Sequence, residues 1–156
     1  MNRILIITLI LAASVSFSCS TPANNARSNT ATKASPEVKK GVAPVADPEV
    51  ALIEMENAAF GTIKMELYSN VAPKAVERFK ELTKEGYYEG IIFHRVNDTV
   101  IQAGNADTKP GKSPNSAKEG DSGKPNVQAE FSDVPYETGI VGAARLGNDV
   151  NSANAQ

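Results

Sequence analysis

Hydrophobic and polar residues recur along the C-terminal two-thirds of the chain in patterns that predict several elements. Residues 50–56 and 62–68 alternate apolar with polar positions over part of their length, and a short turn joins them. They predict an antiparallel hairpin with one buried face. Residues 72–86 repeat apolar positions at helical spacing, with Pro73 in the first turn and Gly86 past the end. This arrangement predicts an amphipathic helix that covers the sheet.

The apolar run over residues 91–96 is rich in β-branched residues and predicts a buried strand. It contains His94, the only histidine of the chain, and Arg95. Arginine is almost never fully buried without a partner, so this strand either exposes Arg95 or presents it in a cleft. A tight turn and a second short strand over residues 100–104 follow.

The remainder of the domain has weaker patterns. Residues 105–125 are rich in Gly, Pro, Ser, Lys and Asp and predict a long surface loop. Residues 127–131 predict brief extended structure. The small residues of 139–145 predict a strand that another backbone or a ligand approaches closely, and the polar residues 148–156 predict a loop.

The N-terminus has the pattern of an export signal. Arg3 precedes the apolar run 4–13, which is too short to span a bilayer comfortably. Small residues at Ser16 and Ser18 precede Cys19, the only cysteine. One interpretation is a plain signal peptide cleaved after Ser18. The other is a lipoprotein signal, cut before a lipidated Cys19; the segment resembles a lipobox, except that Ser16 replaces the usual Leu or Val. The position of the sole cysteine favours the lipoprotein.

These observations predict a signal peptide at 1–18, a lipid-anchored linker at 19–48 and a folded domain at 49–156. The linker has no aromatic residue and no periodicity, so it cannot bury enough apolar surface to offset chain entropy and should be disordered. We expect an exported, membrane-anchored protein of the cell envelope or periplasm.

Composition excludes several functional classes. The net charge is −2 and no basic run is present, so nothing favours nucleic acid as a partner. One cysteine and one histidine cannot form a four-ligand structural zinc site or a disulfide within the chain. Nucleotide-binding fingerprints and a Gly-x-Ser-x-Gly elbow are absent from the sequence. We expect no metal and no cofactor. We also expect a monomer.

Several short motifs, in their order and spacing, resemble those of cyclophilin-type peptidyl-prolyl isomerases. The resemblance runs from about Val50 to the last residue and rests on Glu66-Leu67-Tyr68, Ala72-Pro73, Val76, Phe79, Gly86-Tyr87-Tyr88, Phe93-His94-Arg95-Val96, Ile101-Gln102, Glu130-Phe131 and Asn151-Ser152-Ala153. The family fold is a closed, eight-stranded antiparallel β-barrel capped by two helices. The resemblance implies a mainly β fold with one or two helices, and proline-containing unfolded or extended polypeptides as partners.

Rotation about an X–Pro bond is opposed by amide resonance, with a barrier of about 18–20 kcal/mol. A donor aimed at the prolyl nitrogen stabilises the twisted transition state, in which that nitrogen gains a lone pair. A guanidinium suits this task because it is planar and always charged. By resemblance, Arg95 has this role and Gln102 orients it while binding the substrate backbone. Ala144, Arg145 and Gln156 match positions that line the peptide groove.

The chain also departs from the family pattern. His94 lies in the motif but is interpreted as structural or groove-flanking, since no proton must move. The pocket phenylalanine falls on Thr99, and the next pocket position is Val100. The family's Gln-Gly-Gly-Asp has Ala103 as its second residue here. Family members continue past Gln156 with two phenylalanines and roughly a third more of the domain.

The resemblance therefore implies the N-terminal two-thirds of a domain, and hence an incomplete barrel with unpaired edges. The lead hypothesis is a prolyl isomerase that assists the folding of exported proteins. The alternatives are a non-catalytic peptide-binding or chaperone-like module, an inactive fragment, and a β-rich surface domain whose likeness is accidental.

Overall fold

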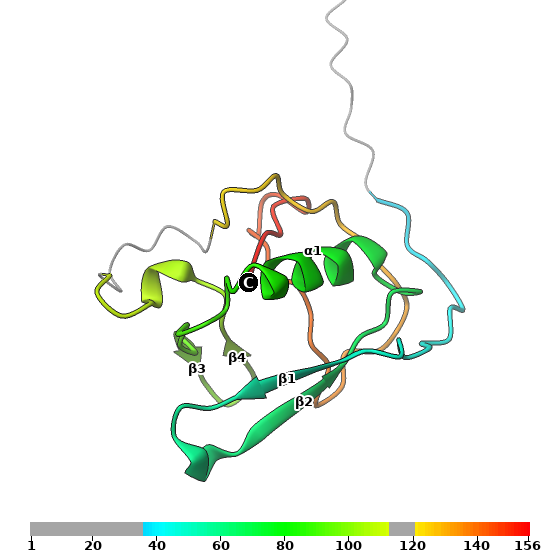
Figure 1. Cartoon of the computed structure of the whole chain (residues 1–156). Helices are drawn as coiled ribbons and strands as arrows, with labels where there is room; N and C mark the ends of the chain where they lie inside the picture. The colour runs from blue at the N-terminus through cyan, green and yellow to red at the C-terminus, as the bar shows by residue number, and fades with distance from the viewer. Residues whose placement is uncertain (1–35, 113–120) are drawn as a thin grey trace, which may run out of the picture. The chain divides into compact units, whose positions relative to one another are not determined.

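The computed structural model describes residues 36–112 and 121–156 (Figure 1). Within these residues the chain is mostly strands and irregular segments with one α-helix, and two 3-10 turns accompany them. In chain order the elements are β1 (Val50–Glu54), η1 (Ala58–Phe60), β2 (Thr62–Glu66), α1 (Pro73–Lys84), β3 (Arg95–Val96), β4 (Ile101–Gln102) and η2 (Ala106–Thr108).

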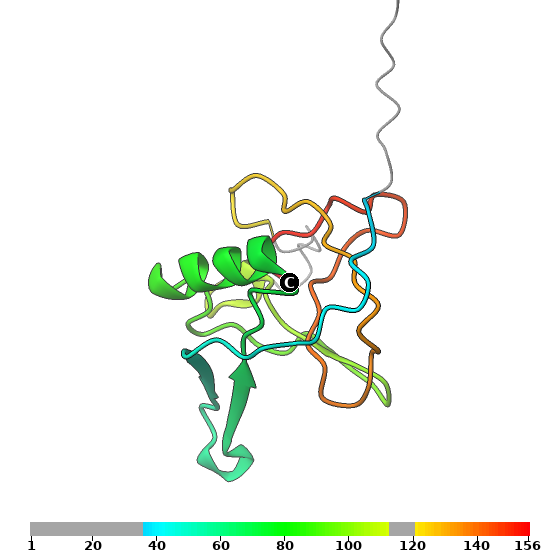
Figure 2. The same cartoon turned by 90° about the vertical axis from the view of Figure 1, so that its right-hand side faces the viewer.

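The predicted hairpin is confirmed. β1 pairs antiparallel with β2, and the two strands lie side by side in the ribbon of Figure 2. In this register Ile53 lies opposite Ile63. Exposure alternates along both strands: Ala51, Ile53, Ile63 and Met65 are half-buried, whereas Lys64 and its neighbours on the other face are exposed. The alternation in the sequence therefore does place apolar side chains on one face of this two-stranded sheet.

The predicted helix is also confirmed, with a well-defined end. The amide of Gly86 donates to the carbonyl of Thr83 at 3.1 Å, and the amide of Tyr87 donates to that of Leu82 at 2.9 Å. These two bonds form a Schellman motif, which requires the positive φ of +69° that Gly86 adopts. Gly86 therefore terminates α1, as the sequence predicts.

The start of α1 is capped by a residue far away in the sequence. Ala72, at the N-cap, makes no side-chain cap bond. Instead Glu130 Oε2 accepts hydrogen bonds from the amides of Lys74 and Ala75, at 2.9 and 3.0 Å. A carboxylate at this end also interacts favourably with the helix dipole. The helix is thus joined at its first turn to the segment that precedes Phe131.

Among the described residues the buried apolar core is small. Leu82 of α1 is completely buried. Four other apolar residues are buried: Leu67, Val127, Ala153 and Ala155. The ring of Phe79, which is half-buried, packs against that of Tyr88 with 5.3 Å between centroids.

A closed barrel is not found in the part of the chain that the structure describes. Its sheets are two separate two-stranded sheets, β1–β2 and β3–β4, and two isolated bridges pair Lys39 with Ser132 and Val127 with Ala153. The bridge at Val127 is the only regular pairing in the predicted extended segment 127–131. The barrel character that the resemblance implied is therefore not observed.

The predicted buried strand over 91–96 is wrong for most of its length. Only Arg95 and Val96 form strand structure, and Ile92 and Val96 are 52% and 68% exposed. The preceding amides are used elsewhere: Ile91 closes a turn by donating to the carbonyl of Tyr88, and Ile92 donates to the hydroxyl of Thr108 in the distant η2. Without a neighbouring strand, an apolar run has no ladder to join.

The predicted strand over 139–145 is wrong as well. This segment is irregular, and the amide of Ile140 closes a turn by donating to the carbonyl of Glu137 at 3.1 Å. Within this segment, Ala144 contacts a distant backbone: its amide donates to the carbonyl of Gln156. The predicted surface loop 105–125 begins with η2, and its residues 113–120 lie outside the described part.

The predicted disordered linker differs from the structure at its C-terminal end. From residue 36 to Pro48 the chain lies against the domain: the amide of Lys39 donates to the carbonyl of Phe131 at 2.8 Å, and Lys39 Nζ donates to the carbonyl of Val71 at 2.7 Å. Asn70 accepts from the amide of Val45 and donates to the carbonyl of Ala43. Polar contacts hold this segment, which explains why its low apolar content was misleading.

The predicted signal peptide and Cys19 lie outside the described residues. Across residues 36–112 and 121–156, no helix is long and apolar enough to cross a membrane.

The same N-terminal segment contains a strongly perturbed carboxylate. Asp47 accepts hydrogen bonds from the hydroxyl of Ser69 at 2.6 Å and from Nζ of Lys80 at 3.0 Å. These contacts with Ser69 and Lys80 lower the pKa of Asp47 from 3.8 to about 2. Because the charged form is favoured in the folded state, its contribution is complete above pH 3.8 and is lost as the pH falls through about 2.

Replacing this carboxylate should therefore change acid stability. We expect Asp47→Asn to reduce the loss of unfolding free energy between about pH 4 and pH 2, measured by urea denaturation at several pH values. Ser69→Ala, which removes the hydroxyl that donates to Asp47, should also reduce this loss of unfolding free energy. If the unfolding free energy of both variants fell with pH as steeply as that of the wild type, the contribution assigned to Asp47 would be contradicted.

Candidate functional site

The β3–β4 hairpin places Arg95 beside Gln102. The two residues are directly opposite each other in the antiparallel register, so their side chains lie on one face, with Cβ atoms about 4.5–5.5 Å apart. Arg95 is exposed and Gln102 is half-buried. The hairpin thus presents a guanidinium to solvent next to a partly anchored amide.

The turn of this hairpin is held by Asn97. Its amide donates to the carbonyl of Val100 at 3.0 Å, and its Oδ1 accepts from the amides of Thr99 and Val100 at 3.0 and 2.9 Å. The hydroxyl of Thr99 also donates to Oδ1. Thr99 and Val100 are both exposed, so neither lines an enclosed pocket.

The last residue joins this hairpin to the irregular segment 139–145. Gln102 Nε2 donates to Gln156 Oε1 at 2.5 Å, and the amide of Ala144 donates to the carbonyl of Gln156 at 2.9 Å. The structure thereby brings together Arg95, Gln102, Ala144 and Gln156, which the sequence analysis singled out.

The backbone at Gly104 makes a close contact with the C-terminal residues. A Cβ at Gly104 would lie 2.2 Å from the carbonyl oxygen of Ala155, and the φ of Gly104 is +103°. Only glycine fits here, because both the space and the backbone conformation exclude a side chain. This contact brings Gln156 to Gln102.

Two tyrosines that the sequence analysis named only as part of a family motif support the same contact. Tyr87 donates to the carbonyl of Gly104 at 3.1 Å, and Tyr88 donates to that of Ala155 at 3.2 Å. Burial, followed by the nearby Tyr87, raises the pKa of Tyr88 to about 12, so this phenol remains protonated and donating. The paired tyrosines directly after the helix end were the available signal for this role.

Within the described part of the chain, the predicted site residues His94 and Arg145 make no hydrogen bond or ion pair with this cluster. His94 is exposed. Arg145 lies over the ring of Phe131, 5.9 Å from its centroid, and donates to the carbonyl of Leu146 at 3.2 Å. The Phe131 contact orients the Arg145 side chain, a role that the sequence did not indicate.

The cluster of Arg95, Gln102, Ala144 and Gln156 offers hydrogen-bond donors and acceptors to an extended peptide. A shallow depression of about 410 Å³ lies elsewhere, along α1, and its lining includes Lys80 and Asp47, which pair with each other. No group of three His, Cys, Asp or Glu side chains that could hold a metal ion occurs among the described residues. The cluster itself can supply hydrogen bonds and charge stabilisation by the guanidinium.

Comparison with known proteins identifies the family. The family model described as "Cyclophilin type peptidyl-prolyl cis-trans isomerase/CLD" matches residues 52–156. This chain belongs to the cyclophilin-type peptidyl-prolyl cis-trans isomerase family.

Curated relatives agree with this assignment. A "Probable peptidyl-prolyl cis-trans isomerase" of Brucella suis biovar 1 (strain 1330) is 39% identical over 120 residues, which cover 73% of this chain and 59% of the relative. A peptidyl-prolyl cis-trans isomerase of Schizosaccharomyces pombe is 50% identical over 56 residues, 35% of this chain and 36% of the relative. The chain thus spans 59% of the length of the Brucella relative. No solved structure matches the chain significantly.

The contact at Gly104 can be tested by a single methyl group. We expect Gly104→Ala to lower the free energy of unfolding by about 2–5 kcal/mol, because it adds a steric clash to an unfavourable backbone conformation. Urea denaturation measures this loss.

The matched control is Gly111→Ala. Gly111 also has a positive φ, +82°, but a Cβ there would meet nothing within 4 Å. Gly111→Ala should therefore lower the free energy of unfolding by only about 1–2 kcal/mol. Equal losses in the two variants would show that the contact with Ala155 does not constrain the fold.

Proposed function

We propose that this protein is a peptidyl-prolyl cis-trans isomerase that assists the folding of exported proteins, with Arg95 stabilising the twisted prolyl amide. The observation that carries the proposal is the placement of Arg95 directly opposite Gln102, whose side chain is fixed by Gln156. Membership of the isomerase family supports the reaction class. The reaction breaks no covalent bond, so these residues need only bind and orient the peptide.

In the proposed mechanism, an extended proline-containing segment lies across the face that Arg95 and Gln102 share. Gln102 binds the peptide backbone, and Ala144 and Gln156 border the bound segment. The Arg95 guanidinium donates to the prolyl nitrogen as the C–N bond twists. Because that lone pair is available only in the twisted state, the hydrogen bond stabilises the transition state more than the ground state.

A non-catalytic peptide-binding module is the second candidate. It is favoured by Thr99, which stands at the position of the pocket phenylalanine, is exposed, and hydrogen-bonds to Asn97 instead. A protein of this kind would bind proline-containing peptides without accelerating their isomerisation.

Removing the guanidinium distinguishes the two candidates. We expect Arg95→Ala to lower kcat/KM for a proline-containing peptide by about 10²–10³-fold, the usual effect of deleting one transition-state donor. The assay uses the mature protein produced from its own gene. Arg95→Lys should recover little of the rate, since an ammonium lacks the planar fork.

Lys64→Ala is the control, because Lys64 is exposed on β2; its rate should equal that of the wild type. A wild-type protein that binds the peptide without accelerating its isomerisation would support the binding module. Equal rates for the wild type and Arg95→Ala would refute the catalytic role of Arg95.

We further propose that the protein is exported and held at a membrane of the cell envelope by lipid on Cys19. The support is the sequence: a short apolar segment, small residues before the cysteine, and a polar segment after it. A hydrophobic anchor here would leave the domain free to meet polypeptides as they emerge.

Lipidation can be tested in the native organism. Cys19→Ala should abolish incorporation of labelled palmitate and move the protein from the membrane fraction to the soluble fraction. Ser20→Ala, next to the proposed cut site, should change neither result. An unlabelled wild-type protein with Cys19 absent from its mature N-terminus would refute the anchor.

A further inference from the structure

Asn154 uses its whole side-chain amide to hold a neighbouring segment. Its Oδ1 accepts from the amide and the hydroxyl of Ser122, at 2.9 and 2.5 Å. Its Nδ2 donates to the carbonyl of Lys124 at 2.9 Å and to Oδ1 of Asn126 at 3.0 Å. All four hydrogen-bonding positions of the amide are thus filled. The backbone partners, one donor and one acceptor, fix which way the amide faces.

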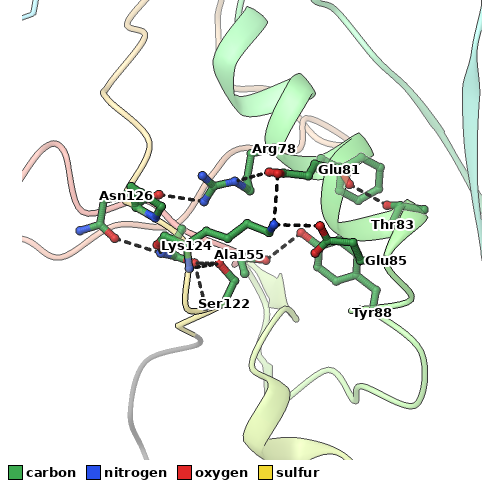
Figure 3. Close-up of polar contacts among 12 residues, drawn as sticks. Arg78, Glu81, Thr83, Glu85, Tyr88, Ser122, Lys124, Asn126 and Ala155 are labelled. Carbon is green, nitrogen blue, oxygen red and sulfur yellow. Dashed lines mark hydrogen bonds and ion pairs between the residues drawn. The ribbon is translucent and has the colours of Figure 1, made fainter.

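The segment that Asn154 holds is tied in turn to α1 (Figure 3). Lys124 Nζ pairs with Glu81 at 3.1 Å and with Glu85 at 2.8 Å. Arg78 Nη1 donates to the carbonyl of Pro125 at 2.9 Å, while its Nε pairs with Glu81 at 3.1 Å. Residues 122–126 therefore rest on one side of a helix whose Leu82 is fully buried.

Asn154 lies two residues before Gln156, which belongs to the candidate site. Next to it, Ala155 is buried and its carbonyl accepts from Tyr88 (Figure 3). The following residue, Gln156, contacts Gln102 through its side chain. A shift of the backbone at Asn154 would be transmitted over two peptide units to this contact.

We propose that Asn154 is a positioning residue: by fastening residues 153–156 to residues 122–126, it holds Gln156 against Gln102 and so orients Arg95. The contacts define a continuous route from α1 to the side chain of Gln102, which lies directly opposite Arg95 in the β3–β4 register. This gives the described end of the loop 105–125 a role in the site. The catalytic consequence rests on the proposed function, whereas the structural one does not.

The structural consequence is tested first, without any activity. In Asn154→Ala, the side-chain amide resonances of Gln102 and Gln156 should shift in a ¹⁵N-correlated NMR spectrum, because their hydrogen bond is displaced. Ser122→Ala, which keeps the backbone donor to Asn154, should give smaller shifts of the same resonances. Unchanged Gln102 and Gln156 resonances in a folded Asn154→Ala protein would overturn the proposal.

The matched control is Asn70→Ala. Asn70 also accepts from one backbone amide and donates to one carbonyl, but it holds the segment at Ala43 and Val45. We expect this variant to lose stability without shifting the Gln102 and Gln156 resonances. Shifts equal to those of Asn154→Ala would mean that they report general loosening, and would also overturn the proposal.

The catalytic consequence is a loss of kcat/KM of about 10- to 100-fold in Asn154→Ala, as expected for a misplaced site, with Asn70→Ala unchanged. A combined Asn154→Ala and Gln102→Ala variant should lose less than the product of the two separate losses. An inactive wild type would refute the proposed function, while the NMR result would still decide the role of Asn154.

Discussion

The candidate site depends on one close contact, between the backbone of Gly104 and that of Ala155 and Gln156. The two segments are far apart in the sequence, so their association closes a long loop, whose entropic cost grows with the logarithm of its length. Burial of Ala155 and hydrogen bonds from Tyr88 and Gln102 offset this cost. Because Gly104 has no side chain, these bonds can form at hydrogen-bond distance.

The parts of the fold that the sequence predicted are those whose signals are local. The β1–β2 hairpin follows from alternation over a few residues, and α1 follows from its apolar repeat and from Gly86. Segments 91–94 and 139–145 were predicted wrongly because a strand requires a partner, and an apolar or small-residue run does not specify one. Residues 36–48 were misjudged for a related reason: Lys39 and Asp47 bind through hydrogen bonds that composition does not reveal.

The site divides in the same way. The proximity of Arg95 and Gln102 follows from a short turn and the register of one hairpin. Gln156 was singled out only through the resemblance, and its contact with Gln102 depends on the distant approach at Gly104. Asn154 carried no signal at all, since an asparagine in a polar C-terminal run has many uses. Its four partners become evident only when residues 122–126 are placed beside it.

The exposure of Arg95 sets a condition on the proposed chemistry. A charge in bulk water interacts several-fold more weakly than one near a low-dielectric surface, so the guanidinium gains strength only when a peptide excludes water from it. Val100, in the turn that precedes β4, is 38% exposed and offers apolar surface to such a peptide. Because that surface is small, the proposed catalysis depends more on the orientation of Arg95 before binding than on apolar contact with the peptide. Among residues 36–112 and 121–156, no hydrogen bond or ion pair fixes the head group of Arg95. Gln102, anchored by Gln156, is the neighbour in the hairpin that can restrict it.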